Sequence, residues 1–224
     1  MSAARAVIRG VAAPLPRENI DTDQIIPKHH LITVERQGLG RGLFSEWRFA
    51  PDGTERQDFV LNQPAFRDAK ILVAGANFGC GSSREHAVWA LLDYGIEAVV
   101  SSAFASIFEE NAAKNALATI RLPEADVRAL LAAIDALPGE ETTVDLQACM
   151  VVAPDGQQFR FEMAPARRRA LIEGLDEIGM TLERADRIAA FQQRDRQQRP
   201  WVYEVPGRRA ETPGTHHNHP RRHT

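Results

Sequence analysis

The pattern of apolar positions is clearest in the middle of the chain, where apolar runs alternate with amphipathic segments. Residues 70–75 contain a short apolar run typical of a buried strand, and a glycine-rich loop follows it. Apolar positions then recur at i, i+3, i+4 and i+7, the spacing of one helix face, at Ala87, Ala90, Leu91 and Tyr94. They predict a helix over residues 83–94.

The same alternation continues with predicted strands at residues 97–101 and 117–122 and predicted helices at 104–114 and 123–137. Strands that alternate with helices favour parallel pairing in this stretch. Shorter strands are predicted on either side, at residues 6–11, 58–61, 143–146, 150–152 and 158–162, and the last two form a hairpin around a Pro-Asp-Gly turn. Helices at 166–174 and 181–193 follow. The fold class is therefore α/β, with a mixed sheet flanked by helices.

Composition agrees with a folded domain and narrows the class of protein. Of 224 residues, 44% are hydrophobic and 25% are charged, as in ordinary globular proteins. There is no apolar run near 18 residues and no signal-peptide pattern near the N-terminus. Two cysteines, Cys80 and Cys149, lie far apart, which excludes a disulfide scaffold and favours a reducing compartment, so we expect a cytoplasmic protein. Because an iron–sulfur cluster normally needs three or four cysteine ligands, we expect none bound by this chain.

Charge divides the chain into two parts. Residues 194–224 carry seven Arg against three acidic residues, a net +4, so residues 1–193 carry −7 of the total −3. We therefore predict one domain over residues 1–193 and a basic, disordered extension over 194–224. The acidic body is a poor candidate for nucleic-acid binding, which favours a basic face.

The strongest chemical signal is the segment Gly75-Ala-Asn-Phe-Gly-Cys-Gly-Ser-Ser-Arg-Glu-His86, between a predicted strand and a predicted helix. A helix N-terminus has free N–H groups and a positive dipole end, which suit an anion. Ser82 and Ser83 add hydroxyl groups, and Arg84 adds a two-pronged cation that fits a carboxylate. The phosphate-loop lysine is absent, and Arg84 replaces the third glycine of the dinucleotide motif. The segment therefore predicts a carboxylate ligand.

Each of these residues also has a purely structural interpretation. Ser82 and Glu85 have the spacing of a capping box, with Ser82 as the N-cap. Arg84 fits a solvated first-turn cation, although its charge opposes the helix dipole, which favours an anionic ligand or an acidic partner. Cys80 fits a reactive thiol at a helix N-terminus or a small packing residue. His86 fits an ordinary packed or surface histidine.

Other candidate ligands are weaker. Asp21 and Asp23 resemble a metal pair, but carboxylates that bond to their own backbone in a turn explain them as well. His29 and His30 cannot share one face of a strand or helix, which disfavours a zinc pair. The histidines near the C-terminus fit a disordered tail or adventitious metal binding, at His216, His217, His219 and His223.

The run from Asn77 to Ala87 resembles the signature of the mobile domain of the aconitase superfamily. More closely, the chain resembles the bacterial small subunits of 3-isopropylmalate dehydratase. Matching blocks occur in the same order at residues 19–27, 43–49, 58–64, 77–87, 89–95 and 174–182, within residues 5–195. Six ordered blocks are more specific than any single motif.

The resemblance implies a swivelling β/β/α domain and a separate large subunit that carries a [4Fe–4S] cluster. It implies isomerisation of 2-isopropylmalate to 3-isopropylmalate in leucine biosynthesis, by dehydration and rehydration. Ser82 would be the catalytic base, Arg84 would hold a substrate carboxylate, and Ser83 would bond to the substrate or orient Ser82. Neither nucleic acid nor membrane is implied as a partner.

The resemblance also implies that the loop after Pro27 selects the substrate. Relatives that act on a tricarboxylate have an arginine there, which aligns with Ile32. An apolar Ile32 suits an isopropyl group, although ordinary anchoring of the loop is an equal alternative.

Some departures from the family pattern leave other functions open. Asn115-Ala-Leu-Ala-Thr119 stands where the family has Asn-Gly-Leu-Leu-Pro, Val88 replaces a proline, and Met163-Ala-Pro165 lacks the usual Ile-Asp pair. These departures keep two alternatives open: a related hydro-lyase for another 2-alkylmalate, such as citramalate or a dimethylmalate, and a non-catalytic carboxylate-binding module.

Overall fold

The computed structural model describes residues 5–31, 37–175 and 177–203. It divides the chain into two compact units, Met1–Met180 and Thr181–Thr224. The first unit holds the sheet and the candidate site, and the second holds most of the C-terminal helical segment. The boundary at residue 193 remains a prediction, but helix α8 (Ala185–Gln198) continues past it into the segment expected to be a tail.

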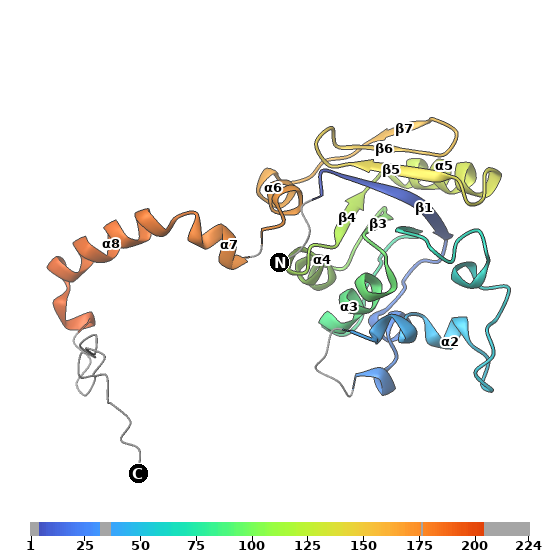
Figure 1. The fold of residues 1–224 in the computed structure, drawn as a ribbon, viewed down its shortest axis with the longest axis horizontal. Coiled ribbons are helices and arrows are strands. Elements are labelled where there is room, and N and C mark those ends of the chain that lie inside the picture. The colour runs from blue at the N-terminus through green and yellow to red at the C-terminus, as the bar shows by residue number, and fades with distance from the viewer. Residues whose placement is uncertain (1–4, 32–36, 176, 204–224) are drawn as a thin grey trace, which may run out of the picture. The chain divides into compact units, whose positions relative to one another are not determined.

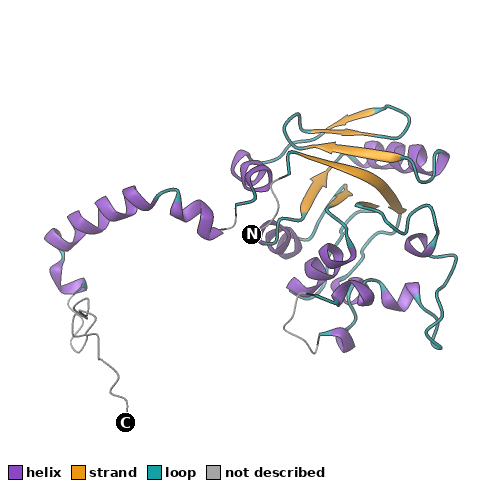
Figure 2. Ribbon diagram, in the orientation of Figure 1, coloured by secondary structure: helices purple, strands orange, loops and turns teal. Residues whose placement is uncertain are grey.

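One seven-stranded mixed sheet organises the first unit (Figures 1 and 2). The strands lie in the order β4-β3-β2-β1-β5-β6-β7. Their bounds are β1 Val7–Leu15, β2 Ile71–Ala74, β3 Ala98–Ser101, β4 Ala118–Arg121, β5 Glu141–Asp145, β6 Met150–Val152 and β7 Gln158–Arg160. The mixed α/β fold predicted from the sequence is confirmed.

Strand β1 joins a parallel half of the sheet to an antiparallel half. Its C-terminal part pairs in parallel with β2, with Leu15 opposite Ala74, and β3 and β4 continue that half. Its N-terminal part pairs antiparallel with β5, with Val7 opposite Asp145, and β6 and β7 follow as hairpin strands. All residues of β2 and β3 are buried, as expected for parallel strands covered on both faces.

Helices cover the parallel half. Their bounds are α3 Glu85–Tyr94, α4 Ser106–Lys114, α5 Glu124–Ala136 and α6 Pro165–Glu173. Helix α5 packs against β1, β2 and β3, while α3 packs against α4. Gly95 ends α3 with a φ of 115°, a left-handed conformation that glycine adopts without strain.

Short helical turns replace regular structure between β1 and β2. Their bounds are α1 Thr22–Ile25, η1 Lys28–His30, η2 Leu39–Gly42, α2 Ser45–Arg48 and η3 Val60–Asn62. The predicted strand at residues 58–61 is wrong, because most of that segment forms the 3₁₀ turn η3. Buried Arg48 donates to the carbonyls of Gly40 and Leu43, and Asn62 donates to the carbonyl of Arg48. These bonds satisfy backbone groups that a sheet would otherwise pair.

The C-terminal segment contains two helices where the sequence predicted one. Helix α7 spans Glu177–Leu182, and α8 begins three residues later. Asp195, near the end of α8, accepts hydrogen bonds from Arg199 Nε at 2.7 Å and from the Tyr203 hydroxyl at 2.9 Å. The last segment of the predicted tail, residues 204–224, lies outside the described residues. Within the part of the chain that the structure describes, no helix has the length and apolar character needed to cross a membrane.

Candidate active-site loop

The loop between β2 and α3 runs beside a segment that follows β1. Asn19 N donates to the carbonyl of Ala76, Gly79 N to that of Ile20, and Thr22 N to that of Cys80. Asp21 and Cys80 form an isolated parallel bridge. Two of the sequence blocks that carry the family resemblance, residues 19–27 and 77–87, are therefore held together through their backbones.

A left-handed backbone and a close aromatic ring shape this loop. Gly79 has a φ of 76°, and a Cβ added to it would lie only 2.3 Å from Phe108 Cγ. The Phe108 ring packs edge-on against Phe78, with 5.2 Å between ring centroids. Only glycine fits at this position, because a side chain would meet both the ring and a strained backbone.

Helix α3 begins after the two serines. Its N-cap is Arg84, with extended backbone and no side-chain cap bond, and the first helical residue is Glu85. The capping box predicted at Ser82 is therefore wrong. The capping box found is in α1, where Gln24 N donates to Asp21 Oδ1 at 2.7 Å and Asp21 N donates to Gln24 Oε1 at 2.8 Å. The predicted turn-forming role of Asp21 is confirmed.

Arg84 pairs with Asp23, which confirms the acidic-partner alternative. Arg84 Nη1 donates to Asp23 Oδ1. The Arg84 side chain is 12% exposed and that of Asp23 is 44% exposed, so the ion pair lies at the edge of the protein. The hydrogen bond from Arg84 holds the pKa of Asp23 below its ordinary value. The guanidinium is thus fixed in place before any ligand binds.

Ser82 and Ser83 are exposed directly before α3. The backbone of Ser82 is nevertheless held, because Thr22 Oγ1 donates to the Ser82 carbonyl at 2.9 Å. The structure therefore brings together Ser82, Ser83 and Arg84, three of the four predicted site residues. The fourth, Ile32, lies outside the described residues.

Thr22 and Asp23 were missed as supports of this loop. Both belong to the block at residues 19–27, which the sequence resemblance matched without assigning roles to its polar positions. Asn115, at the end of α4, is a further support: its Nδ2 donates to Glu85 Oε1 at 2.6 Å, and its Oδ1 accepts from Trp89 Nε1 at 2.9 Å. The first turn of α3 is held through these bonds.

Cys80 and His86 have ordinary surroundings. Burial, and then the charge of Asp21, raise the pKa of the Cys80 thiol, so the site does not favour a thiolate nucleophile. The His86 ring packs 4.7 Å from that of Trp89. Burial, and then the charge of His29, lower the pKa of His30, whose Nε2 lies 3.0 Å from Ser45 Oγ.

The described part of the chain offers no evident metal ligand set. Among the described residues, no group of three or more His, Cys, Asp and Glu side chains could hold a metal ion. Cys80 precedes α3, whereas Cys149 follows β5 and accepts a hydrogen bond from Arg168 Nη1 at 3.5 Å. These two thiols belong to different elements, so they do not fit an iron–sulfur cluster.

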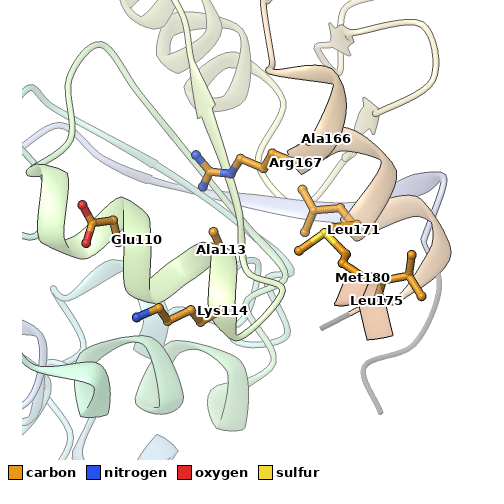
Figure 3. Close-up of a pocket in the computed structure, with 9 residues that line it drawn as sticks. Glu110, Ala113, Lys114, Ala166, Arg167, Leu171, Leu175 and Met180 are labelled. Atoms are coloured by element: carbon orange, nitrogen blue, oxygen red, sulfur yellow. The ribbon is translucent and has the colours of Figure 1, made fainter. Parts of the chain in front are cut away.

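A pocket of about 310 Å³ lies between α4 and the segment that begins with α6 (Figure 3). It is lined by Glu110, Ala113, Lys114, Ala166, Arg167, Ala170, Leu171, Leu175 and Met180. Arg167, at its wall, donates from Nη2 to Thr119 Oγ1 at 2.5 Å. Since Ser82, Ser83 and Arg84 do not line it, this pocket is separate from the candidate site.

Comparisons with known proteins define the class first. The family model described as the aconitase C-terminal domain matches residues 5–125, and models for two parts of the 3-isopropylmalate dehydratase small subunit match residues 128–165 and 177–204. The chain is therefore a subunit of an aconitase-type hydro-lyase. More specifically, it belongs to the family of 3-isopropylmalate dehydratase small subunits.

The relatives agree over nearly their whole length. The small subunit of Rhodospirillum centenum is 54% identical over 88% of this chain and 97% of its own, and that of Paracoccus denitrificans is 52% identical over 87% and 97%. The solved structure of 3-isopropylmalate dehydratase LeuD from Methanocaldococcus jannaschii matches with a TM-score of 0.59 at 26% identity. It covers 83% of this chain and 99% of that one. The family resemblance and the fold expected from it are confirmed.

Proposed function

We propose that this chain forms one wall of a 3-isopropylmalate dehydratase active site, completed by a large subunit. The reaction isomerises 2-isopropylmalate to 3-isopropylmalate by loss and re-addition of water. The observation that carries the proposal is the exposed Ser82–Ser83 pair before α3, next to an arginine fixed by an ion pair. Family membership supports the partner, because a small subunit implies a larger one.

Ser82 acts as the base in this proposal. It must remove a proton from the carbon next to a carboxylate while the hydroxyl on the neighbouring carbon leaves. A serine is a weak base unless its alkoxide is stabilised. Here the positive end of α3 and its first-turn N–H groups lie just after Ser82 in the chain, and Arg84 adds a fixed positive charge.

Arg84 and Ser83 bind the substrate. The Arg84 ion pair with Asp23 uses Nη1, and a planar guanidinium has a second edge that suits a carboxylate. Ser83 donates a hydrogen bond to the same carboxylate or to Ser82. We propose that Ile32 contacts the isopropyl group of the substrate.

The cofactor belongs to the partner. A [4Fe–4S] cluster on the large subunit supplies Lewis-acid chemistry toward the hydroxyl that leaves. This chain holds the substrate against that group but provides none of its ligands. Because both of its thiols are free, we propose that the two subunits work in the reducing cytoplasm.

The direct test is an anaerobic assay of this chain with a cluster-loaded large subunit. Alkene formation from 2-isopropylmalate and from citramalate is followed by ultraviolet absorbance. We expect turnover of 2-isopropylmalate only when both subunits are present. Activity on citramalate alone would transfer the same mechanism to a different alkylmalate. Binding of a dicarboxylate by this chain alone, without turnover of either substrate, would favour the non-catalytic module.

Two adjacent serine variants separate base from binding group. Ser82→Ala is expected to lower kcat by about 10²–10⁴-fold, the usual contribution of a positioned acid or base. Ser83→Ala is the matched neighbour, and it should raise KM with a smaller effect on kcat. Equal turnover by Ser82→Ala and the wild type would remove the base assignment.

Arg84→Lys tests the carboxylate contact. Lysine keeps the charge but loses the two-pronged geometry, so KM should rise roughly tenfold, equivalent to about 1.4 kcal/mol. Arg128→Lys is the control, since Arg128 is exposed on α5 and pairs only with Glu124 in the described contacts. If both variants keep the wild-type KM, Arg84 does not bind substrate.

A further inference from the structure

We propose that Thr22 is a positioning residue for Ser82. The proposal rests on the base role given to Ser82 above and deepens it. Thr22 is the first residue of α1 and is 2% exposed. Its backbone N–H donates to the Cys80 carbonyl and its hydroxyl donates to the Ser82 carbonyl, each at 2.9 Å. Thr22 therefore grips the loop on both sides of Gly81.

This double contact sets the direction of the Ser82 side chain. Gly81 has a φ of 87°, and a Cβ built on it would lie 3.7 Å from Thr22 Oγ1, so the two segments are in van der Waals contact. The Ser82 side chain is exposed, so packing does not orient it. Its orientation depends on its backbone, and the bond from Thr22 fixes the carbonyl on that backbone.

Helix α1 thereby controls both reacting groups of this chain. Thr22 holds the backbone of Ser82, and the next residue, Asp23, holds the guanidinium of Arg84. The capping box of Asp21 and Gln24 in turn fixes the first turn of α1. A small displacement of a reacting group can cost about 10²-fold in rate, so a single hydrogen bond at this point affects turnover.

The test uses the assembled two-subunit enzyme with three variants. Thr22→Val keeps the side-chain shape but removes the hydroxyl, and Thr22→Ser keeps the hydroxyl. Thr142→Val is the matched control: Thr142 is fully buried in β5, and its hydroxyl has no hydrogen-bond partner within the described residues. The control removes a buried hydroxyl without touching the loop.

We expect Thr22→Val to lower kcat at least tenfold with KM changed less than about threefold. Thr22→Ser should recover kcat to within about threefold of the wild type, and Thr142→Val should leave both constants unchanged. Amide hydrogen exchange over residues 80–84 should become faster in Thr22→Val and not in Thr142→Val. A purely structural role would lower the melting temperature without this selective loss of kcat.

The outcomes distinguish this inference from the function it rests on. Normal turnover by Ser82→Ala would overturn both. If Ser82→Ala is inactive but Thr22→Val keeps its kcat, or if Thr22→Ser is as impaired as Thr22→Val, only the positioning role is overturned. Should Thr22→Val fail to fold, Thr22→Ala replaces it, because water can then satisfy the Ser82 carbonyl without fixing its direction.

Discussion

Gly79→Ala is expected to be far more damaging than a glycine substitution at an open position. The added Cβ would lie 2.3, 2.5 and 2.6 Å from Phe108 Cγ, Cδ2 and Cβ. Gly53 provides the matched control, since its φ of 83° is close to the 76° of Gly79, but a Cβ there has no atom within 4 Å. Gly53→Ala therefore measures the backbone term alone, and Gly79→Ala measures the backbone term plus the clash.

The two terms have different sizes. A left-handed conformation costs a residue with a Cβ about 1–2 kcal/mol. Overpacking of a core adds about 1–3 kcal/mol, and here the neighbour is a buried ring with little freedom to move. The free energy of unfolding should thus fall by about 1–2 kcal/mol in Gly53→Ala and about 2–5 kcal/mol in Gly79→Ala.

The assay is thermal and denaturant unfolding of the isolated chain, followed by circular dichroism. At about 2–4 °C per kcal/mol for a chain of this size, the melting temperature should fall by about 2–8 °C for Gly53→Ala and roughly 5–15 °C for Gly79→Ala. Adding Phe108→Leu to Gly79→Ala should recover about 0.5–3 kcal/mol relative to the sum of the single changes. Equal losses for the two glycines, or no coupling to Phe108, would refute the packing argument.

Three further variants test other parts of the fold. Ala116 has a φ of 56°, so Ala116→Gly should raise the free energy of unfolding by about 0.5–1 kcal/mol; an unchanged denaturant midpoint would contradict this. Arg48→Met leaves the Gly40 and Leu43 carbonyls without their donor and should cost about 3–5 kcal/mol in the same measurement; a loss below about 1 kcal/mol would show that these bonds contribute little. Because the pKa of Asp23 is lowered in the folded state, its stabilisation is present above the unfolded pKa and is lost as pH falls through the folded pKa. Asp23→Asn should therefore lower stability near neutral pH by less than about 1 kcal/mol, with no difference from the wild type in acid; a difference independent of pH would exclude the ion pair as its cause.

The parallel half of the sheet could be predicted from the sequence because its signals are local. The run at residues 70–75 and the helical spacing up to Tyr94 each report burial directly. The predicted strand at residues 58–61 failed for the opposite reason. Phe59 and Leu61 are both buried, which mimics the alternation of a strand, but the neighbouring backbone groups bond to side chains such as Asn62.

The start of α3 shows the same limit at the candidate site. Ser82 and Glu85 have capping-box spacing, yet Thr22, 60 residues away in the sequence, bonds to the Ser82 carbonyl, and the helix begins only at Glu85. A contact over that separation leaves no local pattern. The Arg84 partner could be predicted only as an acidic residue, because a cation in a first turn needs a negative charge but does not indicate which one supplies it.

Strand β1 has a consequence for the order in which the protein can form during synthesis. It is made first, yet it pairs on one side with β2, complete at Ala74, and on the other with β5, complete at Asp145. On the ribosome its N-terminal half must wait for about 130 further residues, on the order of ten seconds at ordinary rates of synthesis. During that interval an apolar edge is without its neighbour, which makes the early chain a natural client for chaperones that bind exposed strands.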